Sequence, residues 1–140
     1  MDTQTLGRLG EETAARFLES RGFRIIERNL HIGHAEIDII AEDAVYLLFV
    51  EVKTRRQVPG ANTPFGTPSE AVDARKQSLL LKAAETYLTE HESMKFPRID
   101  VIEVYADPDC TAYRVLDVRH FENAVRKTGK FSRKYSRYQK

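Results

Sequence analysis

Residues 44–55, AVYLLFVEVKTR, decide the fold of this chain. Seven uncharged residues run directly into Glu51, Val52 and Lys53. An apolar run of this length, rich in Val, Leu, Tyr and Phe, predicts a strand that is buried on both faces. Side chains alternate along a strand, so Glu51 and Lys53 share one face while Val50 and Val52 share the other. Because a buried unpaired charge costs several kcal/mol, both charges need a partner, which is a metal ion, a phosphate or each other.

A second strand with acidic residues precedes this one. Residues 35–40, AEIDII, predict a strand whose two acids, Glu36 and Asp38, share one face. The turn-like residues 42–43 predict a hairpin that places Asp38 opposite residue 49 or 50, close to Glu51. Two carboxylates and a lysine would then crowd one sheet face, an arrangement suited to a hard cation such as Mg²⁺.

The composition indicates one soluble globular domain. The chain has 140 residues, of which 41% are hydrophobic and 31% are charged. No apolar run is longer than the seven residues described above, so we expect no signal peptide, no membrane span and no membrane partner. A single cysteine, Cys110, excludes an internal disulfide and a cysteine-based zinc site. These features predict a cytoplasmic protein.

Charge is distributed unevenly between a predicted domain, residues 1–123, and a basic tail, residues 124–140. The tail holds seven basic residues and no acid, which leaves 15 basic against 21 acidic residues in the rest of the chain. The net formal charge is therefore −6 for the body and +7 for the tail. Aromatic residues interleave the basic ones, so the tail is suited to lie along a phosphate backbone and stack on bases. A solvated terminus is the alternative interpretation.

Hydrophobic periodicity predicts an α/β fold, a mixed five-stranded sheet flanked by helices. Residues 67–70, TPSE, form a capping box that predicts the start of the second helix. The expected elements, in order, are a helix at 5–21, strands at 23–31, 35–40 and 44–53, a helix at 68–92, strands at 97–105 and 111–118, and a short helix at 120–126.

Four motifs resemble those of a known family. GRLGEETAARFL at 7–18, EIDIIA at 36–41, FVEVKTR at 49–55 and EAVDARKQ at 70–77 match, in order and spacing, the YraN-like uncharacterised protein family. The resemblance extends from Leu6 to about Val118. It implies the fold of the restriction-endonuclease-like, PD-(D/E)xK nucleases, similar to archaeal Holliday junction resolvases. One departure is Ala35, where the family usually has glycine.

The resemblance also implies roles for individual residues. Asp38, Glu51, Glu11 and the carbonyl of Val52 would hold Mg²⁺ or Mn²⁺, and Lys53 would be the catalytic lysine. Gln77 resembles a helical glutamine that follows the lysine strand in several branches of the superfamily. Glu11 considered without the resemblance has a simpler interpretation, since a glutamate in the middle of a helix is ordinarily solvated.

Basic residues near these positions are candidates for binding nucleic acid, with DNA favoured over RNA. They occur after the central strand, on the second helix and in the tail: Arg55, Arg56, Arg75, Lys76, Lys130, Arg133, Lys134 and Arg137. A plain surface loop is an equal interpretation of the segment that begins at Arg55. If the substrate is a four-way junction, symmetric cleavage requires a homodimer with two sites.

Three functions fit the sequence. The first is a metal-dependent nuclease that hydrolyses phosphodiester bonds in DNA, with branched or structured DNA as a substrate class. The second is a nucleic-acid-binding module of nuclease fold without independent cleavage, in which Lys53 simply pairs with Glu51 and Asp38. The third is a protein-interaction role for the sheet edge. His31 and His34 are expected at the surface rather than in a metal site.

Overall fold

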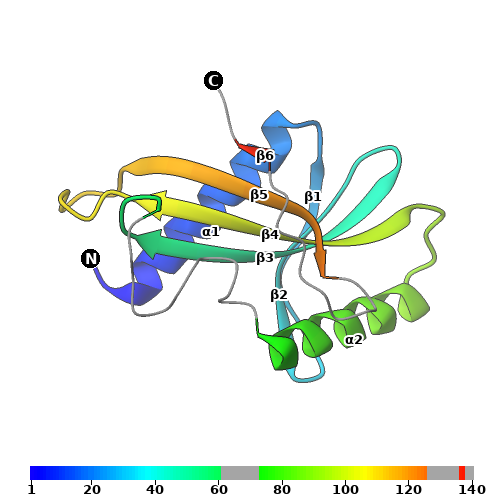
Figure 1. Cartoon of the computed structure of the whole chain (residues 1–140). Helices are drawn as coiled ribbons and strands as arrows, with labels where there is room; N and C mark the ends of the chain where they lie inside the picture. The colour runs from blue at the N-terminus through cyan, green and yellow to red at the C-terminus, as the bar shows by residue number, and fades with distance from the viewer. Residues whose placement is uncertain (61–72, 126–135, 138–140) are drawn as a thin grey trace.

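The apolar run at residues 44–50 lies in the middle of a mixed sheet. The structure, a computed structural model, describes residues 1–60, 73–125 and 136–137. Its elements, in order, are α1 Thr3–Ser20, β1 Arg24–Ile32, β2 Ala35–Glu42, β3 Tyr46–Arg56, α2 Ala74–Glu90, β4 Phe96–Ala106, β5 Val115–Val125 and β6 Ser136–Arg137. The strands lie in the order β1-β2-β3-β4-β5-β6 (Figure 1), and of the described strands only β3 and β4 pair in parallel. The predicted α/β fold with five long strands is therefore confirmed, and a two-residue strand is added at the edge.

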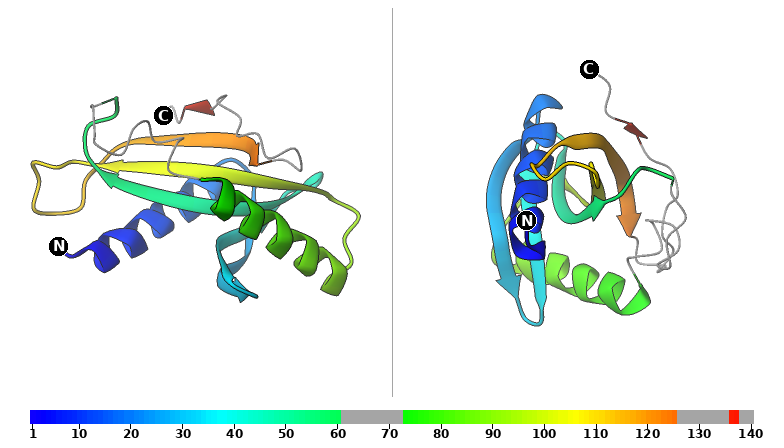
Figure 2. Two further views of the ribbon diagram at one scale, coloured as in Figure 1. Left: turned by 60° about the horizontal axis from the view of Figure 1, so that its bottom comes forward. Right: turned by 90° about the vertical axis from the view of Figure 1, so that its left-hand side faces the viewer.

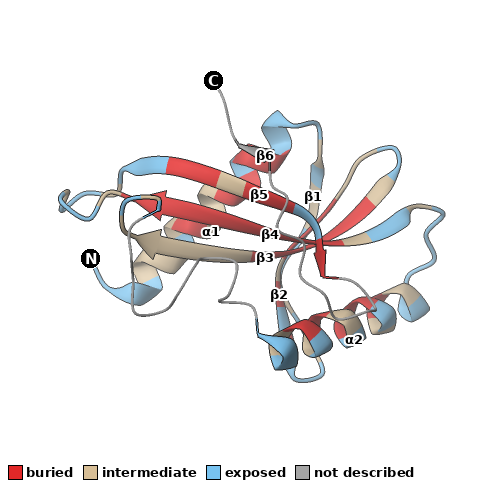
Figure 3. Cartoon of the chain, viewed as in Figure 1, coloured by how far each residue is buried: buried red, intermediate tan, exposed pale blue. Residues whose placement is uncertain are grey.

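The two helices cover opposite faces of the sheet (Figure 2), and each face has its own apolar cluster. The α1 cluster includes Ala14, Leu18, Leu48, Val50 and Ile102. The α2 cluster includes Phe49, Leu80, Tyr87, Val101 and Phe121. Successive apolar residues of β3 and β4 thus alternate between two buried layers, which is why residues 46–50 of β3 form an unbroken uncharged run. Figure 3 shows β4 buried along most of its length. Among the described residues, no helix is long and apolar enough to cross a membrane.

Helix α1 packs closely against the end of β3. A Cβ atom built on Gly10 would lie 1.8 Å from Oγ1 of Thr54, so only glycine allows this approach. The helix ends as its sequence predicts, with Gly22 in the left-handed region at φ +90°. The amide groups of Gly22 and Phe23 donate to the carbonyls of Glu19 and Leu18, which closes a Schellman motif.

Helix α2 begins later than predicted. Its N-cap is Asp73, whose side chain accepts a hydrogen bond of 2.8 Å from the backbone amide of Lys76. The capping box predicted at residues 67–70 lies outside the described residues. The helix ends at Glu90, close to the predicted end, and provides the crossover between the parallel strands β3 and β4.

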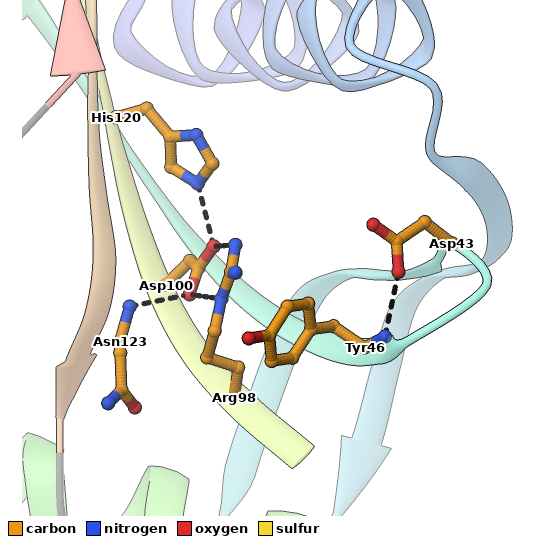
Figure 4. A network of polar contacts seen from close by, with 6 residues as sticks. All are labelled: Asp43, Tyr46, Arg98, Asp100, His120 and Asn123. Carbon is orange, nitrogen blue, oxygen red and sulfur yellow. Dashed lines mark hydrogen bonds and ion pairs between the residues drawn. The ribbon is translucent and has the colours of Figure 1, made fainter. Parts of the chain in front are cut away.

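The prediction of a short helix at 120–126 is wrong, because β5 continues as far as Val125. The reason is a polar network around Asp100 of β4 (Figure 4), whose carboxylate is fully buried. Asp100 accepts hydrogen bonds from both Nε and Nη2 of Arg98, from the amide of Asn123 at 2.8 Å, and lies 2.7 Å from Nε2 of His120. These tertiary contacts override the local helical preference. The strand also extends past the domain boundary expected at residue 123, and Ala124 and Val125 are buried.

The hairpin between β2 and β3 sets the register of the candidate site. Asp43 closes the turn, because its side chain accepts hydrogen bonds from the amides of Val45 and Tyr46. Ile39 of β2 pairs with Val50 of β3, so Asp38 and Glu51 are the next residues along the two strands. The predicted proximity of these two acids is therefore correct, and Asp38 lies opposite residue 51, one residue beyond the expected 49 or 50.

Candidate active site

Glu51 is a buried carboxylate on the central strand. Its side chain is only 5% exposed, and its Oε1 atom lies 3.3 Å from Nζ of Lys53 and 3.2 Å from Nζ of Lys76. The other oxygen, Oε2, is buried and has no hydrogen-bond partner in the part of the chain that the structure describes. Glu51 and Lys53 lie on the same face of β3, as the alternation predicted, while Val50 and Val52 pack toward the α1 cluster. One oxygen of Glu51 thus contacts two ammonium groups, and the other has no hydrogen-bond partner within the described ranges.

Asp38 of β2 is the second acid of this cluster. Its Oδ2 atom accepts a hydrogen bond of 2.7 Å from the backbone amide of Val52. Burial raises the pKa of Asp38, and so do the negative charges of Glu51, Glu11 and Glu36; together, against the Val52 hydrogen bond, they bring it to about 8. Asp38 therefore lies in a partly buried group of carboxylates that disfavours its ionised form.

Glu11 reaches the cluster from α1, where the close contact of Gly10 with β3 places it. Its pKa is raised by burial and by Glu36 and Glu51, while Arg28 and a hydrogen bond from the Asn29 side chain lower it. The charges of Glu36 and Glu51 thus act on Glu11, and its role in the site stays a prediction.

Glu36 is a fourth carboxylate of the cluster that the sequence analysis did not include among the site residues. Its side chain is 45% exposed and lies 3.7 Å from Nε2 of His31, which is 75% exposed, as expected for a surface histidine. The signal that could have identified Glu36 is its predicted position on the same strand face as Asp38. The sequence therefore predicted three of the four acids.

The fit of this cluster to a metal ion depends on its donors. Within residues 1–60, 73–125 and 136–137, no three carboxylate, imidazole or thiol groups enclose an ion as they stand. The donor chemistry nevertheless suits a hard cation, because carboxylate oxygens converge and Oε2 of Glu51 has no partner. Val52 contributes its amide to Asp38, and a role for its carbonyl stays a prediction. The residues therefore fit Mg²⁺ or Mn²⁺ by donor type.

The first turn of α2 borders the site. Lys76 contacts Glu51 directly, Gln77 is 7% exposed, and Arg75 is exposed. Lys76 was predicted only as a nucleic-acid contact, so its ion pair with Glu51 is a finding of the structure. The roles of Arg75 and Gln77 stay predictions.

The other predicted nucleic-acid contacts are more dispersed. Arg56 donates a hydrogen bond of 2.7 Å to the carbonyl of Cys110, and the charge of Arg55 lowers the pKa of Glu103. Lys130, Arg133 and Lys134 lie outside the described residues, and only the backbone of Arg137 is described, in β6. The predicted role of the tail therefore stays a prediction.

A further buried acid, Glu103, lies on β4 and was missed by the sequence analysis. It pairs laterally with Lys53, is fully buried, and accepts a hydrogen bond of 3.1 Å from the hydroxyl of Tyr105. Burial raises the pKa of Glu103 to about 7, while Tyr105, Arg55 and Arg119 act to lower it. The signal was present in the sequence, because Glu103 interrupts an apolar strand as Glu51 does.

A cavity of about 600 Å³ lies on the other side of the sheet, between α1 and the start of β5. Its lining includes Arg16, Phe17 and Leu116 and none of the four site acids. The candidate site is therefore assigned from charge and burial rather than from cavity size.

Comparison with known proteins gives both a family and a set of relatives. The model of the family described as Uncharacterised protein family UPF0102 matches residues 10–104. A UPF0102 protein of Symbiobacterium thermophilum is 46% identical over 108 residues, which cover 76% of this chain and 87% of the relative. A UPF0102 protein of Dictyoglomus thermophilum is 39% identical over 125 residues, which cover 89% of this chain and 99% of the relative.

Among solved structures, the chain is similar to Pyrococcus furiosus SfsA, which was solved in complex with Ca²⁺. The TM-score is 0.37 and the sequence identity is 20%, with 81% of this chain covered. The match covers 63% of the SfsA chain, which is less than two thirds of its length.

Proposed function

The chain belongs to the uncharacterised protein family UPF0102, the YraN-like family that its motifs predicted, and from this premise we propose that it is a metal-dependent nuclease. Its reaction is the hydrolysis of phosphodiester bonds in DNA, and branched or structured DNA is the substrate class that we propose to test first. The observation that supports this proposal is the buried, unpartnered Oε2 of Glu51 on β3 among the described residues, beside the partly buried carboxyl group of Asp38.

Buried acids are ordinarily paired with cations, because removing a carboxylate from water is costly. Here Oε2 of Glu51 is buried with no hydrogen-bond partner among the described residues, and burial together with neighbouring carboxylates raises the pKa of Asp38. A purely structural charge cluster would be more stable with fewer acids at this point. The arrangement is better explained by a divalent cation, which Asp38, Glu51 and Glu11 would hold.

The proposed mechanism assigns a role to each group of the chain. When bound, Mg²⁺ or Mn²⁺ supplies a polarised phosphate oxygen and a water of lowered pKa. Lys53 provides a positive charge on the same strand face, where it orients the attacking water or neutralises charge on the phosphate. The Val52 amide fixes the orientation of Asp38 through a 2.7 Å hydrogen bond. Arg55 and Arg75 bind the DNA backbone, so binding is expected to depend on salt rather than sequence.

The experiment that tests this proposal is cleavage of labelled four-way junction, flap, single-stranded and duplex DNA with Mg²⁺ or Mn²⁺ at low salt. Asp38→Ala and Lys53→Ala are expected to abolish cleavage, and chelation of the metal is expected to do the same. Glu90→Gln, an exposed change at the far end of α2, serves as the matched control. Cleavage that survives in Asp38→Ala would assign the activity to a contaminant or to another site.

A second candidate function is a nucleic-acid-binding module without independent cleavage. The observation that favours it is the double ion pair of Glu51, since Lys53 and Lys76 neutralise one oxygen without any metal. Fluorescence anisotropy on the same DNA panel distinguishes the two functions. Binding without cleavage by the wild-type protein supports the module, and the absence of salt-dependent binding would favour a protein partner instead.

The homodimer remains part of the junction hypothesis. Symmetric cleavage of a four-way junction needs two sites related by a two-fold axis. Analytical ultracentrifugation of the protein with and without junction DNA tests this point. A monomer on the junction would favour flaps or single strands as the substrate.

A further inference from the structure

Lys76 occupies a position that helix stability does not explain. It lies three residues after the N-cap Asp73, in a first turn that contains no acidic residue. The N-terminus of a helix carries partial positive charge, so a lysine there is less favourable than an acid. The capping hydrogen bond comes from the Lys76 backbone and does not require a lysine side chain. The position of this ammonium group therefore calls for another explanation.

The contacts of Lys76 supply that explanation. Its Nζ lies 3.2 Å from Oε1 of Glu51, the same oxygen that Nζ of Lys53 approaches to 3.3 Å. Two ammonium groups share one oxygen, while the buried Oε2 has no hydrogen-bond partner among the described residues. Lys76 is the more exposed of the two lysine side chains, 37% against 26%. It is therefore the lysine that solvent or a phosphate reaches more easily.

A cation at Glu51 would change the balance of charge around Lys76. The two positive charges of a divalent cation would repel the two ammonium groups. Lys76, the more exposed lysine, would move away, because it loses less buried contact than Lys53 would. Its backbone stays fixed in the first turn of α2, where amide groups and the helix dipole favour a phosphate. A displaced Lys76 thus remains close enough to the site to bind the nucleic-acid backbone.

We propose that Lys76 is a switching counter-ion: it neutralises Glu51 in the cation-free protein and binds a DNA phosphate once a divalent cation occupies Glu51. This inference rests on the proposed function, because it uses the same cation and the same substrate. It adds a coupling that the nuclease proposal does not require. Cation binding strengthens DNA binding through Lys76, and DNA strengthens cation binding by the same factor.

The coupling is measured without cleavage. Binding of a labelled junction is followed by fluorescence anisotropy with Ca²⁺ or with chelator, at constant ionic strength, and Ca²⁺ binding to the DNA-free protein is followed by calorimetry. Three variants are compared with the wild type. Lys76→Gln removes the ammonium group, Lys76→Arg keeps the positive charge, and Arg75→Gln removes the preceding, exposed charge from the same helix turn.

The expected result has two parts. In the wild type and in Lys76→Arg, Ca²⁺ tightens DNA binding by about fivefold or more, and in Lys76→Gln this gain is lost. Arg75→Gln binds DNA more weakly both with and without Ca²⁺, because Arg75 is itself a proposed backbone contact, but it keeps the same gain. Lys76→Gln also binds Ca²⁺ more tightly without DNA, by a factor on the order of five, because a competing cation has been removed. A purely structural Lys76 would lower stability in Lys76→Gln without raising its Ca²⁺ affinity.

Failure of this inference is distinguishable from failure of the nuclease proposal. If the wild type cleaves DNA but Lys76→Gln keeps both the coupling and the wild-type Ca²⁺ affinity, the switch is overturned and the nuclease stands. If the coupling is present but no DNA is cleaved, the switch stands and the nuclease is overturned. If Lys76→Gln and Arg75→Gln change Ca²⁺ affinity equally, the effect is general electrostatics and the specific role of Lys76 is overturned.

Discussion

Glu103→Gln is expected to stabilise the protein at alkaline pH. Glu103 is fully buried on β4, with one oxygen accepting from Tyr105 and the other, Oε2, buried without a hydrogen-bond partner among the described residues. Burial raises its pKa from the ordinary value of 4.5 to about 7. Glutamine has the same shape, keeps an acceptor for the Tyr105 hydroxyl and cannot ionise.

The sign follows from proton linkage. A carboxyl group with a raised pKa in the folded state binds its proton more tightly there than in the unfolded chain. The free energy of unfolding therefore falls as pH rises above 4.5 and levels off above about 7. With these two pKa values, Glu103 ionisation destabilises the fold by about 1 kcal/mol at pH 5.5 and by about 3 kcal/mol at pH 8.5. The wild type should thus lose about 2 kcal/mol relative to Glu103→Gln between these pH values.

The assay is urea denaturation of both proteins at pH 5.5 and 8.5, followed by circular dichroism. Other titrating groups, Asp38 among them, contribute equally to both proteins and cancel in the difference between them. Glu90→Gln, which removes an exposed carboxylate, controls for the change in net charge. Parallel stability curves for the wild type and Glu103→Gln would refute the reasoning, because they would show that Glu103 titrates alike in both states.

Three further substitutions test packing and pairing by the same denaturation assay. Asp100→Asn removes the charge that pairs with the partly buried Arg98 and the buried His120, and a loss of about 3–5 kcal/mol is expected. A loss below about 1 kcal/mol would contradict the network. Gly10→Ala presses a methyl group against Thr54 and should cost about 1–3 kcal/mol, with a smaller loss in a Thr54→Gly background; equal losses in both backgrounds would contradict the contact. Gly7→Ala, where no atom lies within 4 Å of the added methyl group, should instead stabilise α1 by about 0.5–1 kcal/mol, and a destabilised variant would contradict this assignment of open space.

The central strand and its charges were predictable because local sequence and tertiary role agree there. An apolar run that ends in Glu51 and Lys53 specifies both burial and alternation, and the structure follows both. The end of α1 was predictable for a similar reason, since Gly22 adopts a left-handed backbone conformation that other residues rarely adopt.

The failures arise where distant residues decide. Residues 120–125 form a strand because Asp100, twenty residues earlier than His120, binds their side chains and backbone. The pairing of Lys76 with Glu51 likewise joins a helix to a strand across the crossover. No local pattern encodes either contact, so periodicity could not identify them.

The ion pairs of Glu51 do not decide between a nuclease and a binding module. A structural charge cluster requires that lysines such as Lys53 and Lys76 neutralise Glu51. A carboxylate that binds a metal ion requires the same lysines when the ion is absent, because a buried charge must be neutralised in every state. The distinguishing feature is instead Oε2 of Glu51, which is buried without a hydrogen-bond partner among the described residues, together with the raised pKa of Asp38, caused by burial and by the neighbouring acids. A structural cluster gains nothing from an unpartnered carboxylate oxygen beside a second, partly buried acid, whereas a divalent cation would bind both. Ca²⁺ titration of the wild type and of Asp38→Ala is therefore decisive: saturable binding that is lost in the variant supports the nuclease site, and the absence of binding to the wild type leaves the lysine pairs as the permanent partners of Glu51.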